Sequence, residues 1–530
     1  MKKGLLYITL GLTLFSSGCT HKYDEINTNP VAVDAARYNA NLLLSKAQYS
    51  YANTGYAQLL FESMWPQLLA STYNYYSNGD KYVASSGIIG YQNQLWINDY
   101  RSASLVYEMV SLANDKQLTN LASAGTIMKV LIMQHITDCY GDVPYSEALK
   151  GKTNIFTPAY DTQESIYTSM LSELETAINA LDDSKDKLTS DLFYHGDIAK
   201  WKRFGYSIML RAAMRLVKVN PTLARQYAEK AATGGTFQSI ADNAYSATDN
   251  STGNGNGTSS ALLVTEDYRE GKWSKPLIDY LKANNDPRLG VVAEVPPAGL
   301  KAGTNSSLAG DRTPAVQVGM PNGYDLAGGS TDVTKRSDYP GSTGAAGDVY
   351  PLGKYSRPTT AVYLDRSAPE FVLTYAETEL LLAEASVRGW TIPGTAAGHY
   401  RNAVSAALQS LATFSSSAAI SAATADAYAT AHPLDQSSTT ASLKMINEQY
   451  WATDGLLFNF IEAWINWRRS GYPVLTPVNY IGNFTGGTIP RRIAYHSTEA
   501  STNPTNYKTA VSRLDKGDTY TSRVWWDVAQ

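Results

Sequence analysis

The sequence predicts a mainly α-helical protein: a tetratricopeptide-like helical scaffold that carries a long insertion rich in loops. From about residue 32 onward, apolar residues recur at spacings of three and four, which is typical of amphipathic helices, and no alternating strand pattern persists. Between about residues 242 and 358 this periodicity is lost, and Gly, Pro and Ser accumulate. We expect a single domain over residues 19–530 after a signal peptide at residues 1–18, because both helical halves are needed for one core.

The N-terminus has the features of a secretion signal with a lipid attachment site. Lys2 and Lys3 precede the uncharged stretch 4–17, which is too short to span a bilayer but is typical of a signal-peptide core. Ser-Ser-Gly and then Cys19 follow, a pattern typical of bacterial lipoproteins, in which cleavage before the cysteine leaves it as the lipidated first residue. We therefore expect Cys19 to be the lipid anchor. Ser16 stands where a leucine is usual, so plain secretory cleavage is the alternative.

Two helices in the first half have clear start signals. Asp161 is a candidate N-cap, with Glu164 three residues later as in a capping box. Asp197 is the candidate N-cap of the next helix, so the two starts lie 197 − 161 = 36 residues apart, close to the period of tetratricopeptide-like helix pairs. That helix closes at the Asn220–Pro221 pair, and Pro221 opens another. The apolar stripe of the first helix comprises Ile166, Tyr167, Met170, Leu171, Leu174, Ile178 and Leu181.

Comparable helical patterns occur on both sides of the insertion. The further helices are expected at about 31–56, 118–138, 369–388, 396–411, 443–453 and 456–469. The insertion contains the run Asn-Ser-Thr-Gly-Asn-Gly-Asn-Gly at 250–257, and few periodic apolar residues follow it. Loops of this length inside a compact protein are usually functional or disordered, so the insertion is a candidate functional region.

Composition and charge exclude several classes of protein. The 530 residues include 44 Lys and Arg against 48 Asp and Glu, and a net charge of −4 leaves no global basic surface for nucleic acid. Once Cys19 is acylated, Cys139 has no cysteine partner, which excludes a disulfide framework, and we expect it to be a buried apolar residue. Tyr, with 37 residues, exceeds Phe, with 11, and its apolar ring with a polar tip suits partly wet contact surfaces.

No segment carries a recognisable catalytic, metal or cofactor motif. The six histidines are scattered, and none stands with another ligand at metal-binding spacing. Neither a phosphate-binding Gly-Lys-Ser/Thr loop nor a Gly-x-Ser-x-Gly nucleophile motif occurs. Glu377, Glu379 and Glu384 fall on one predicted helix, where solvated or capping charges are more typical than a glycosidase pair. We expect no metal, no cofactor and no enzymatic activity.

Aromatic and amide side chains cluster between Trp65 and Tyr100. This combination suits carbohydrate, because sugar rings pack their C–H faces on aromatic planes while their hydroxyl groups need paired donors and acceptors. The alternative is that Trp65, Trp96 and Tyr100 are ordinary core residues between helices. Trp273 and Tyr324, within the insertion, are secondary candidates. The complete candidate ligand-binding set is Tyr73, Asn74, Tyr75, Tyr76, Asp80, Tyr82, Trp96, Trp273 and Tyr324.

Several segments together resemble the SusD/RagB family of nutrient-binding outer-membrane lipoproteins, in particular its SusD-like branch. They follow one another in the expected order and span nearly the whole mature chain, which makes the resemblance more specific than any single motif. The segments are DCYGDVPY (138–145), YDTQESIY (160–167), GDIAKW (196–201), RAAMR (211–215), YAETELLLAEA (375–385), NWRRSGYP (466–473), PRR (490–492) and RVWWD (523–527).

The resemblance implies a mostly helical fold with tetratricopeptide-like units and a loop-rich ligand face. It implies that Cys19 anchors the protein to the outer membrane, facing the exterior, and that the protein sits as a lid on a SusC-like TonB-dependent transporter. The implied function is to capture oligosaccharides and deliver them to that transporter. A peptide-capturing relative and a glycan-cleaving enzyme are the alternatives. The shared arginines are expected to be structural pairing groups: Arg211, Arg215, Arg468, Arg469, Arg491 and Arg492.

Overall fold

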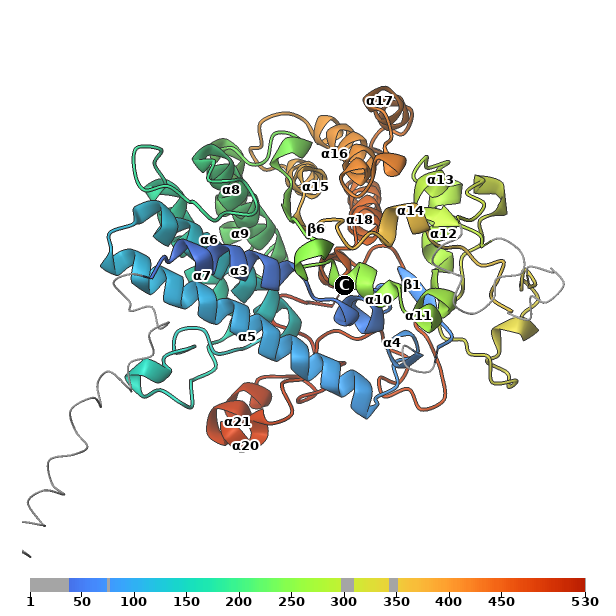
Figure 1. Cartoon of the computed structure of the whole chain (residues 1–530), viewed down its shortest axis with the longest axis horizontal. Coiled ribbons are helices and arrows are strands. Elements are labelled where there is room, and N and C mark those ends of the chain that lie inside the picture. Colours follow the sequence, from blue (N-terminus) through green and yellow to red (C-terminus); the bar gives the residue numbers. More distant parts are fainter. Residues whose placement is uncertain (1–37, 74–76, 297–308, 343–350, 530) are drawn as a thin grey trace, which may run out of the picture. The chain divides into compact units, whose positions relative to one another are not determined.

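The computed structural model describes residues 38–73, 77–296, 309–342 and 351–529. The predicted signal peptide, Cys19 and the candidate residues Asn74, Tyr75 and Tyr76 lie outside the described residues. The described chain is mainly α-helical with short two-stranded sheets, which confirms the predicted fold class (Figure 1). Residues 41–530 cluster as one unit, and the elements below belong to it.

Long helices form the first half of this unit. They are α3 (Asn41–Ala52), α5 (Ser86–Asp115), α6 (Thr119–Tyr140), α7 (Gln163–Ala180), α8 (Ile198–Arg215) and α9 (Pro221–Gly234). From α5 to α9, each helix packs on the next one along the chain (Figure 1, blue to green). Packing between sequence neighbours is typical of helical repeats and agrees with the tetratricopeptide-like spacing.

N-cap side chains lie at the starts of α5, α7, α8 and α9, and the cap of α7 differs from the prediction. The side chain of Thr162, not that of Asp161, caps α7. Asp161 instead accepts hydrogen bonds from the backbone amides of residues 145–146, at 3.0 and 2.8 Å. The capping box is therefore wrong by one residue, because Asp161 holds the turn after α6. The predicted cap Asp197 is confirmed at α8, and α9 begins at Pro221 as predicted, with Asn220 as its N-cap.

The second half contains a further set of packed helices. They are α15 (Tyr375–Val387), α16 (Ala396–Ser410), α17 (Ala422–Ala431), α18 (Thr439–Leu456) and α19 (Phe460–Ser470). α15 begins later than the predicted position 369, because strand β6 (Glu370–Leu373) pairs there with strand β2 (Ala244–Ser246). The sequence analysis does not predict α17, whose run AATADAYATA consists mainly of small residues and has no apolar stripe.

The insertion contains short regular elements. They are α10 (Gly257–Leu262), α11 (Thr265–Glu270), β3 (Gly271–Trp273), α12 (Lys275–Ala283), α13 (Leu289–Val292), β4 (Ala293–Glu294) and β5 (Arg357–Pro358). β3 pairs in antiparallel fashion with β1 (Leu69–Ser71), and β4 pairs with β5. The first pairing ties the insertion to the segment that leads into α4 (Ser77–Lys81). Long-range pairing of this kind leaves no periodic signal in the local sequence.

Short helical turns complete the described chain. They are the π-helix η1 (Gln58–Glu62), the α-helices α14 (Thr360–Tyr363), α20 (Glu499–Thr502) and α21 (Pro504–Ser512), and the 3-10 helices η2 (Gly151–Thr153), η3 (Ile240–Asp242), η4 (Asn250–Thr252), η5 (Pro314–Val316), η6 (Val333–Lys335), η7 (Leu411–Thr413) and η8 (Ser416–Ala418).

A buried ion-pair network joins the two helical halves. Arg211 on α8 donates to both oxygens of Glu377 on α15, at 2.6 Å each. One turn later, Arg215 pairs with Glu462 on α19 and with Asp138 on α6. All five side chains are buried. Because a buried charge without a partner is costly, these pairs fix how α8 packs against α15 and α19.

The shared arginines are structural pairing groups, as predicted, but the glutamates of α15 are not solvated. Arg469 donates to both oxygens of Glu384, at 2.6 and 2.8 Å. Burial raises the pKa of Glu384, yet the guanidinium groups of Arg469 and Arg388 outweigh it and hold that pKa well below its usual range. Glu377 and Glu379 are also buried. The expectation of solvated or capping charges is therefore wrong, because both faces of α15 are covered by packed helices.

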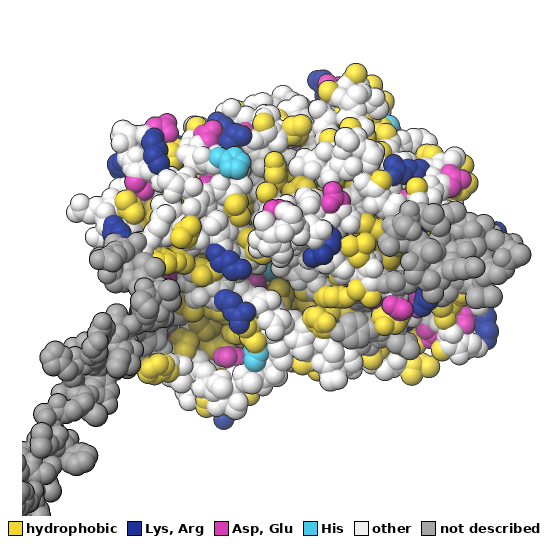
Figure 2. Space-filling model, viewed as in Figure 1, with side chains coloured by type: hydrophobic (Ala, Val, Ile, Leu, Met, Phe, Trp, Pro, Cys, Tyr) yellow, Lys and Arg dark blue, Asp and Glu magenta, His cyan; other side chains and the backbone are white. Residues whose placement is uncertain are grey.

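Two expectations from composition can be compared with the structure. Cys139 lies buried in α6 as a free cysteine, as predicted. On the face shown in Figure 2, positive and negative side chains are scattered over a mainly uncharged surface.

Over the described parts of residues 38–529, no helix has the length and apolar character needed to cross a membrane.

Candidate ligand-binding cleft

A cleft of about 480 Å³ lies where the insertion meets the loop after α19. Its lining comes from Gln67, from the insertion loop 321–336 and from residues 476–479. α12 adds Lys275 and Asp279 to the lining. Segments far apart in the sequence thus converge at one site, the usual arrangement when a rigid scaffold positions ligand-binding loops.

Tyr324 supplies an aromatic ring to this cleft. The guanidinium carbon of Arg336 lies 4.7 Å from the centroid of the Tyr324 ring, and the guanidinium group donates to the Tyr324 hydroxyl. Asp338 holds Arg336 in turn, with N–O distances of 2.7 and 2.8 Å. These hydrogen bonds raise the pKa of Arg336 and lower the pKa of Asp338, so both groups stay charged. The half-buried ring of Tyr324 is therefore held in one orientation.

Asp80 positions the turn that carries Tyr324. Its buried carboxylate accepts hydrogen bonds from Asn322 Nδ2 and, at 2.8 Å, from the backbone N–H of Gly323. Burial raises the pKa of Asp80. Gly323 has a φ of +83°, and a Cβ at this position would lie 2.5 Å from a methyl carbon of Val478. The turn therefore needs both the acceptor below it and a glycine within it.

Asp325 ties the insertion to the loop after α19. Its Oδ2 accepts hydrogen bonds from the hydroxyl groups of Tyr480, at 2.5 Å, and Thr331, at 2.8 Å. Burial raises the pKa of Asp325, but these hydrogen bonds outweigh burial and lower it. Gln67 donates to the backbone carbonyl of Thr476 at 2.6 Å. Polar bonds between separate segments thus hold the walls of the cleft.

Three other candidate residues lie in the core, where their rings offer a ligand little or no surface. Tyr82 and Trp273 have no exposed surface, and Trp96 is 8% exposed. Trp96 packs against Tyr140, with ring centroids 4.9 Å apart. For the segment 65–100, this burial fits the alternative that its aromatic residues are core residues. Trp65, which is 1% exposed, fits the same alternative.

Tyr73 is half-buried just after β1 and does not line the cleft. Its backbone N–H donates to Ser71 Oγ at 3.1 Å. Burial, and then the carboxylates of Asp267 and Glu266, raise the pKa of Tyr73. Among the described candidates, the structure therefore brings Asp80 and Tyr324 together and leaves Tyr73 beside α11.

The sequence analysis misses several residues of the cleft. Asn322, Arg336, Lys275 and Asn479 all line it. The Asn322–Gly323 pair is a recognisable turn signal and could have directed attention to this loop. No sequence signal links Arg336 to Tyr324, because their contact depends on how the loop folds back on itself.

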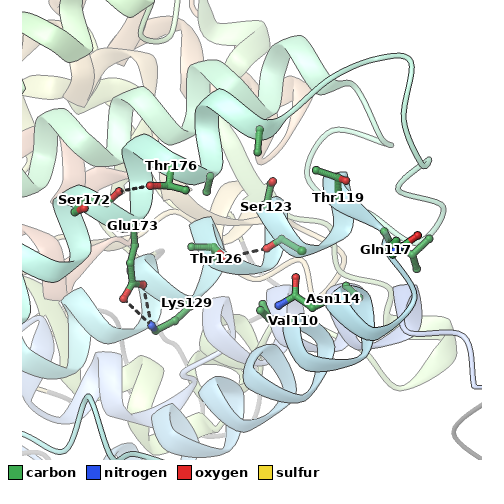
Figure 3. Close-up of a pocket in the computed structure, with 15 residues that line it drawn as sticks. Val110, Asn114, Gln117, Thr119, Ser123, Thr126, Lys129, Ser172, Glu173 and Thr176 are labelled. Carbon is green, nitrogen blue, oxygen red and sulfur yellow. Dashed lines mark hydrogen bonds and ion pairs between the residues drawn. The ribbon is translucent and has the colours of Figure 1, made fainter.

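A second cleft of about 510 Å³ lies between α5, α6 and α7 (Figure 3). Its polar groups are largely satisfied within the helices. Lys129 binds both oxygens of Glu173, at 3.0 and 2.8 Å, and Thr126 and Thr176 donate to backbone carbonyls one turn earlier. No aromatic side chain is among the residues that line it. The cleft at Tyr324 is therefore better suited to a ligand with flat apolar faces.

Within the described ranges of the chain, no group of three or more His, Cys, Asp and Glu side chains is arranged to hold a metal ion. The acidic groups of the cleft accept hydrogen bonds from neighbouring side chains and backbone amides. The arrangement suits binding of a polar ligand.

Comparison with known proteins places these features in a family context. The family model described as SusD-like, starch-binding and associating with the outer membrane, matches residues 32–496. A search of curated proteins found no match.

Solved structures resemble the chain over most of its length. A structure titled as a chitin-binding protein is 31% identical, with a TM-score of 0.77, covering 93% of this chain and 100% of its own. A SusD-like protein titled Bacteroidetes AC2a is 25% identical, with a TM-score of 0.80 and the same coverage. A chitin-binding SusD homologue from Flavobacterium johnsoniae is 23% identical, with a TM-score of 0.69, covering 92% of this chain and 98% of its own.

Proposed function

This chain belongs to the SusD-like branch of the SusD/RagB family, and we propose that it captures neutral oligosaccharides at the cell surface and delivers them to a SusC-like TonB-dependent transporter. The observation that carries the proposal is the cleft of about 480 Å³ in which Arg336 and Asp338 hold the Tyr324 ring. The matching family is described as starch-binding and associated with the outer membrane.

The chemistry of the cleft suits a sugar. A sugar ring stacks its C–H face on an aromatic plane, and stacking of this kind contributes about 1 kcal/mol beyond the area that is buried. The sugar hydroxyl groups need donors and acceptors, and side-chain amides, hydroxyls and charged groups line the same cleft, among them Asn479, Ser330 and Lys275. Tyr73 and the neighbouring Asn74, Tyr75 and Tyr76 are proposed as a second part of the ligand face.

Chitin fragments are the first ligands to test. The relative titled as a chitin-binding protein shares 31% of its residues with this chain. N-acetylglucosamine carries an acetamide group, which pairs well with side-chain amides because each amide offers both a donor and an acceptor. We therefore propose chito-oligosaccharides as the ligand class.

The N-terminal sequence supports attachment to the membrane. We propose that Cys19 carries the lipid anchor after removal of residues 1–18, and that residues 19–530 form one domain facing the exterior. Fatty-acid labelling of cells that produce the protein tests the anchor: the label is expected on the wild type and lost in Cys19→Ala. A label retained by the variant would contradict the assignment.

Isothermal titration of the purified protein against a panel of neutral oligosaccharides, chito-oligosaccharides first, tests the ligand class. Saturable binding of at least one glycan, with the glycan recovered intact, is the expected result. Binding of peptides alone would favour a peptide-capturing relative, and release of shorter glycans would indicate a glycan-cleaving enzyme. Either outcome would overturn the proposal. Co-purification with a TonB-dependent barrel tests delivery.

A further inference from the structure

A short loop projects from the packed helices and carries exposed apolar side chains. It comprises residues 146–158, follows α6 and contains the 3-10 helix η2; Figure 1 shows it in teal below α5. The side chain of Phe156 is 75% exposed, and that of Leu149 is 40% exposed. Large apolar side chains are usually buried, so two exposed ones in a single short loop make that loop a candidate contact surface.

Hydrogen bonds hold this loop in one conformation. Two backbone N–H groups of the η2 turn donate to carbonyls three residues earlier, at 2.9 and 3.0 Å. The Phe156 ring lies against this turn, since a Cβ added at Gly151 would lie 3.8 Å from its Cε1 atom. Just after the ring, Asn506 Nδ2 on α21 donates to the backbone carbonyl of Thr157 at 2.9 Å. An ordered loop therefore presents the apolar side chains.

Two exposed lysines, Lys150 and Lys152, lie between these apolar residues in the sequence. The side chain of Lys152 is 81% exposed. Its Nζ lies 2.6 Å from Glu108 Oε2, but an exposed ion pair of this kind contributes little. Glu147, the acidic residue of the loop, accepts a hydrogen bond from the backbone N–H of Ala159 at 2.8 Å and is thus directed toward the protein. The loop therefore presents apolar side chains together with positive charge.

We propose that this loop docks on the phosphate-bearing surface of the membrane, with the Phe156 ring among the lipid headgroups and with Lys150 and Lys152 beside lipid phosphates. The proposal rests on the proposed lipid anchor at Cys19. At such surfaces an apolar ring leaves water, while each lysine near anionic lipid contributes about 1 kcal/mol. The 41 − 19 = 22 residues from Cys19 to Asn41 span at most about 80 Å, which allows the folded unit to rest on the membrane.

The tether from the anchor enters the folded unit near this loop. Asn41 and Asn120, at the starts of α3 and α6, are both hydrogen-bonded to the segment 186–189. α5 ends four residues before α6 begins, and Lys152 of the loop pairs with Glu108, about two turns before the end of α5. The tether therefore begins at the end of α5 that carries the loop, which favours this end as the one that meets the membrane.

An exposed apolar side chain at the other end of α5 provides a matched control. Ile481, two residues beyond the lining of the cleft, is 85% exposed. Its neighbour Asn483 forms a β-bridge with Val83, three residues before α5 begins at Ser86. From Ser86 to Glu108, α5 runs 108 − 86 = 22 residues, or about 33 Å. We therefore expect Ile481 to stay in water while the loop contacts lipid.

Fluorescence of a label at residue 156 tests the proposal in the lipidated chain. Phe156→Cys and Ile481→Cys each add one accessible thiol, because Cys139 is buried and Cys19 is acylated. Each variant is labelled with the environment-sensitive dye NBD and reconstituted in vesicles of phosphatidylethanolamine and phosphatidylglycerol. A nitroxide-labelled lipid is expected to quench the label at residue 156, whose emission should shift to the blue, and to leave the label at residue 481 unchanged.

Equal quenching of the two labels, or no quenching at residue 156, would overturn the proposal. A blue shift at residue 156 that requires the transporter barrel would also overturn it, because the loop would then contact protein. A chain without an acyl group would not stay on the vesicles, which would overturn the anchor as well.

The role of the lysines is tested in the same assay. Lys150→Gln in the chain labelled at residue 156 should reduce quenching in the anionic vesicles and leave it unchanged in vesicles of neutral phosphatidylcholine. An equal effect in both kinds of vesicle would contradict contact with lipid phosphates. Glycan titration is a separate measurement, since the loop does not line the cleft.

Discussion

Two arginine–aromatic pairs, one in the helical scaffold and one at the cleft, both place a guanidinium group over an aromatic ring but differ in burial. The guanidinium carbon of Arg468 lies 3.7 Å from the ring centroid of Trp464, and its N–H groups donate to two backbone carbonyls, at 2.7 Å each. Arg336 lies 4.7 Å from the ring centroid of Tyr324. Arg468 is buried, whereas the side chain of Arg336 is 26% exposed. The first pair closes a core, and the second lines an open cleft.

The two pairs also differ in whether they lie in segments that resemble the family. Arg468 belongs to the segment 466–473, one of those that resemble the SusD/RagB family. The cleft residues 321–336 and 476–479 lie outside all of those segments. The resembling segment around Arg468 therefore belongs to the scaffold, while the proposed ligand cleft is formed by loops outside the resembling segments. For this reason a family match alone does not identify the glycan.

The largest expected effect comes from breaking the scaffold network. Glu377→Ala removes the closest carboxylate from the buried Arg211 and should lower the free energy of unfolding by about 3–5 kcal/mol. Urea unfolding measures the loss. Glu108→Ala is the control, because the Glu108–Lys152 pair is exposed and its removal should cost at most about 1 kcal/mol. Equal losses would contradict the structural role of the buried network.

A second way to sharpen the contrast is pH, because the pKa of the buried core group Glu62 is raised whereas the pKa of Asp325 beside the cleft is lowered. Burial raises the pKa of Glu62 to about 8; His135 opposes this shift, and Asp99 adds to it. Between the usual pKa of 4.5 and about 8, the folded protein therefore binds a proton that the unfolded chain releases. The free energy of unfolding falls as pH rises through this range. The slope from this group is at most about 1.4 kcal/mol per pH unit.

Urea unfolding at several pH values measures this slope, and Glu62→Gln should reduce it. His135 contributes in the same direction, because its pKa is raised by Asp99 against the effect of burial, and the stability it provides is lost as pH rises. A variant with the same slope as the wild type would show that Glu62 is charged in the folded protein.

A third prediction concerns the turn below Tyr324. Gly323→Ala should lower both stability and glycan affinity, because alanine is strained at a φ of +83° and its Cβ meets Val478. Gly328→Ala is the matched control in the same loop: its φ is +80°, but no atom lies within 4 Å of the added Cβ. Gly328→Ala should lose about 1 kcal/mol of stability, and Gly323→Ala should lose more because its Cβ also meets Val478. Loss of affinity in both would contradict a specific role for the Gly323 turn.

The sequence predicts the scaffold better than the site. Apolar spacing and capping residues locate α7, α8 and α9 closely, because these signals are local. α17 is missed because it lacks large apolar residues, and α15 starts late because a distant strand competes for residues 370–373. Asp161 shows the limit of cap prediction, since its carboxylate is used by another turn.

For the site, composition identifies residue types but not their exposure. Tyr324 lines the cleft and Asp80 supports it, whereas Tyr82 and Trp273 are fully buried. A ring that packs in a core and a ring that stacks on a sugar have the same local sequence signature. Arg336 is missed because its contact with Tyr324 exists only in the folded loop.

The smallest expected effect tests the central claim most directly. Isothermal titration with a glycan that binds the wild type should show an affinity loss of about fivefold, or about 1 kcal/mol, for Tyr324→Ala. Tyr227→Ala is the matched control: Tyr227 is also half-buried with a cation over its ring, Lys230 at 4.9 Å, but it lies on α9. The account predicts wild-type affinity for Tyr227→Ala. Unchanged affinity in Tyr324→Ala, or an equal loss in both variants, would contradict a ligand site at this cleft.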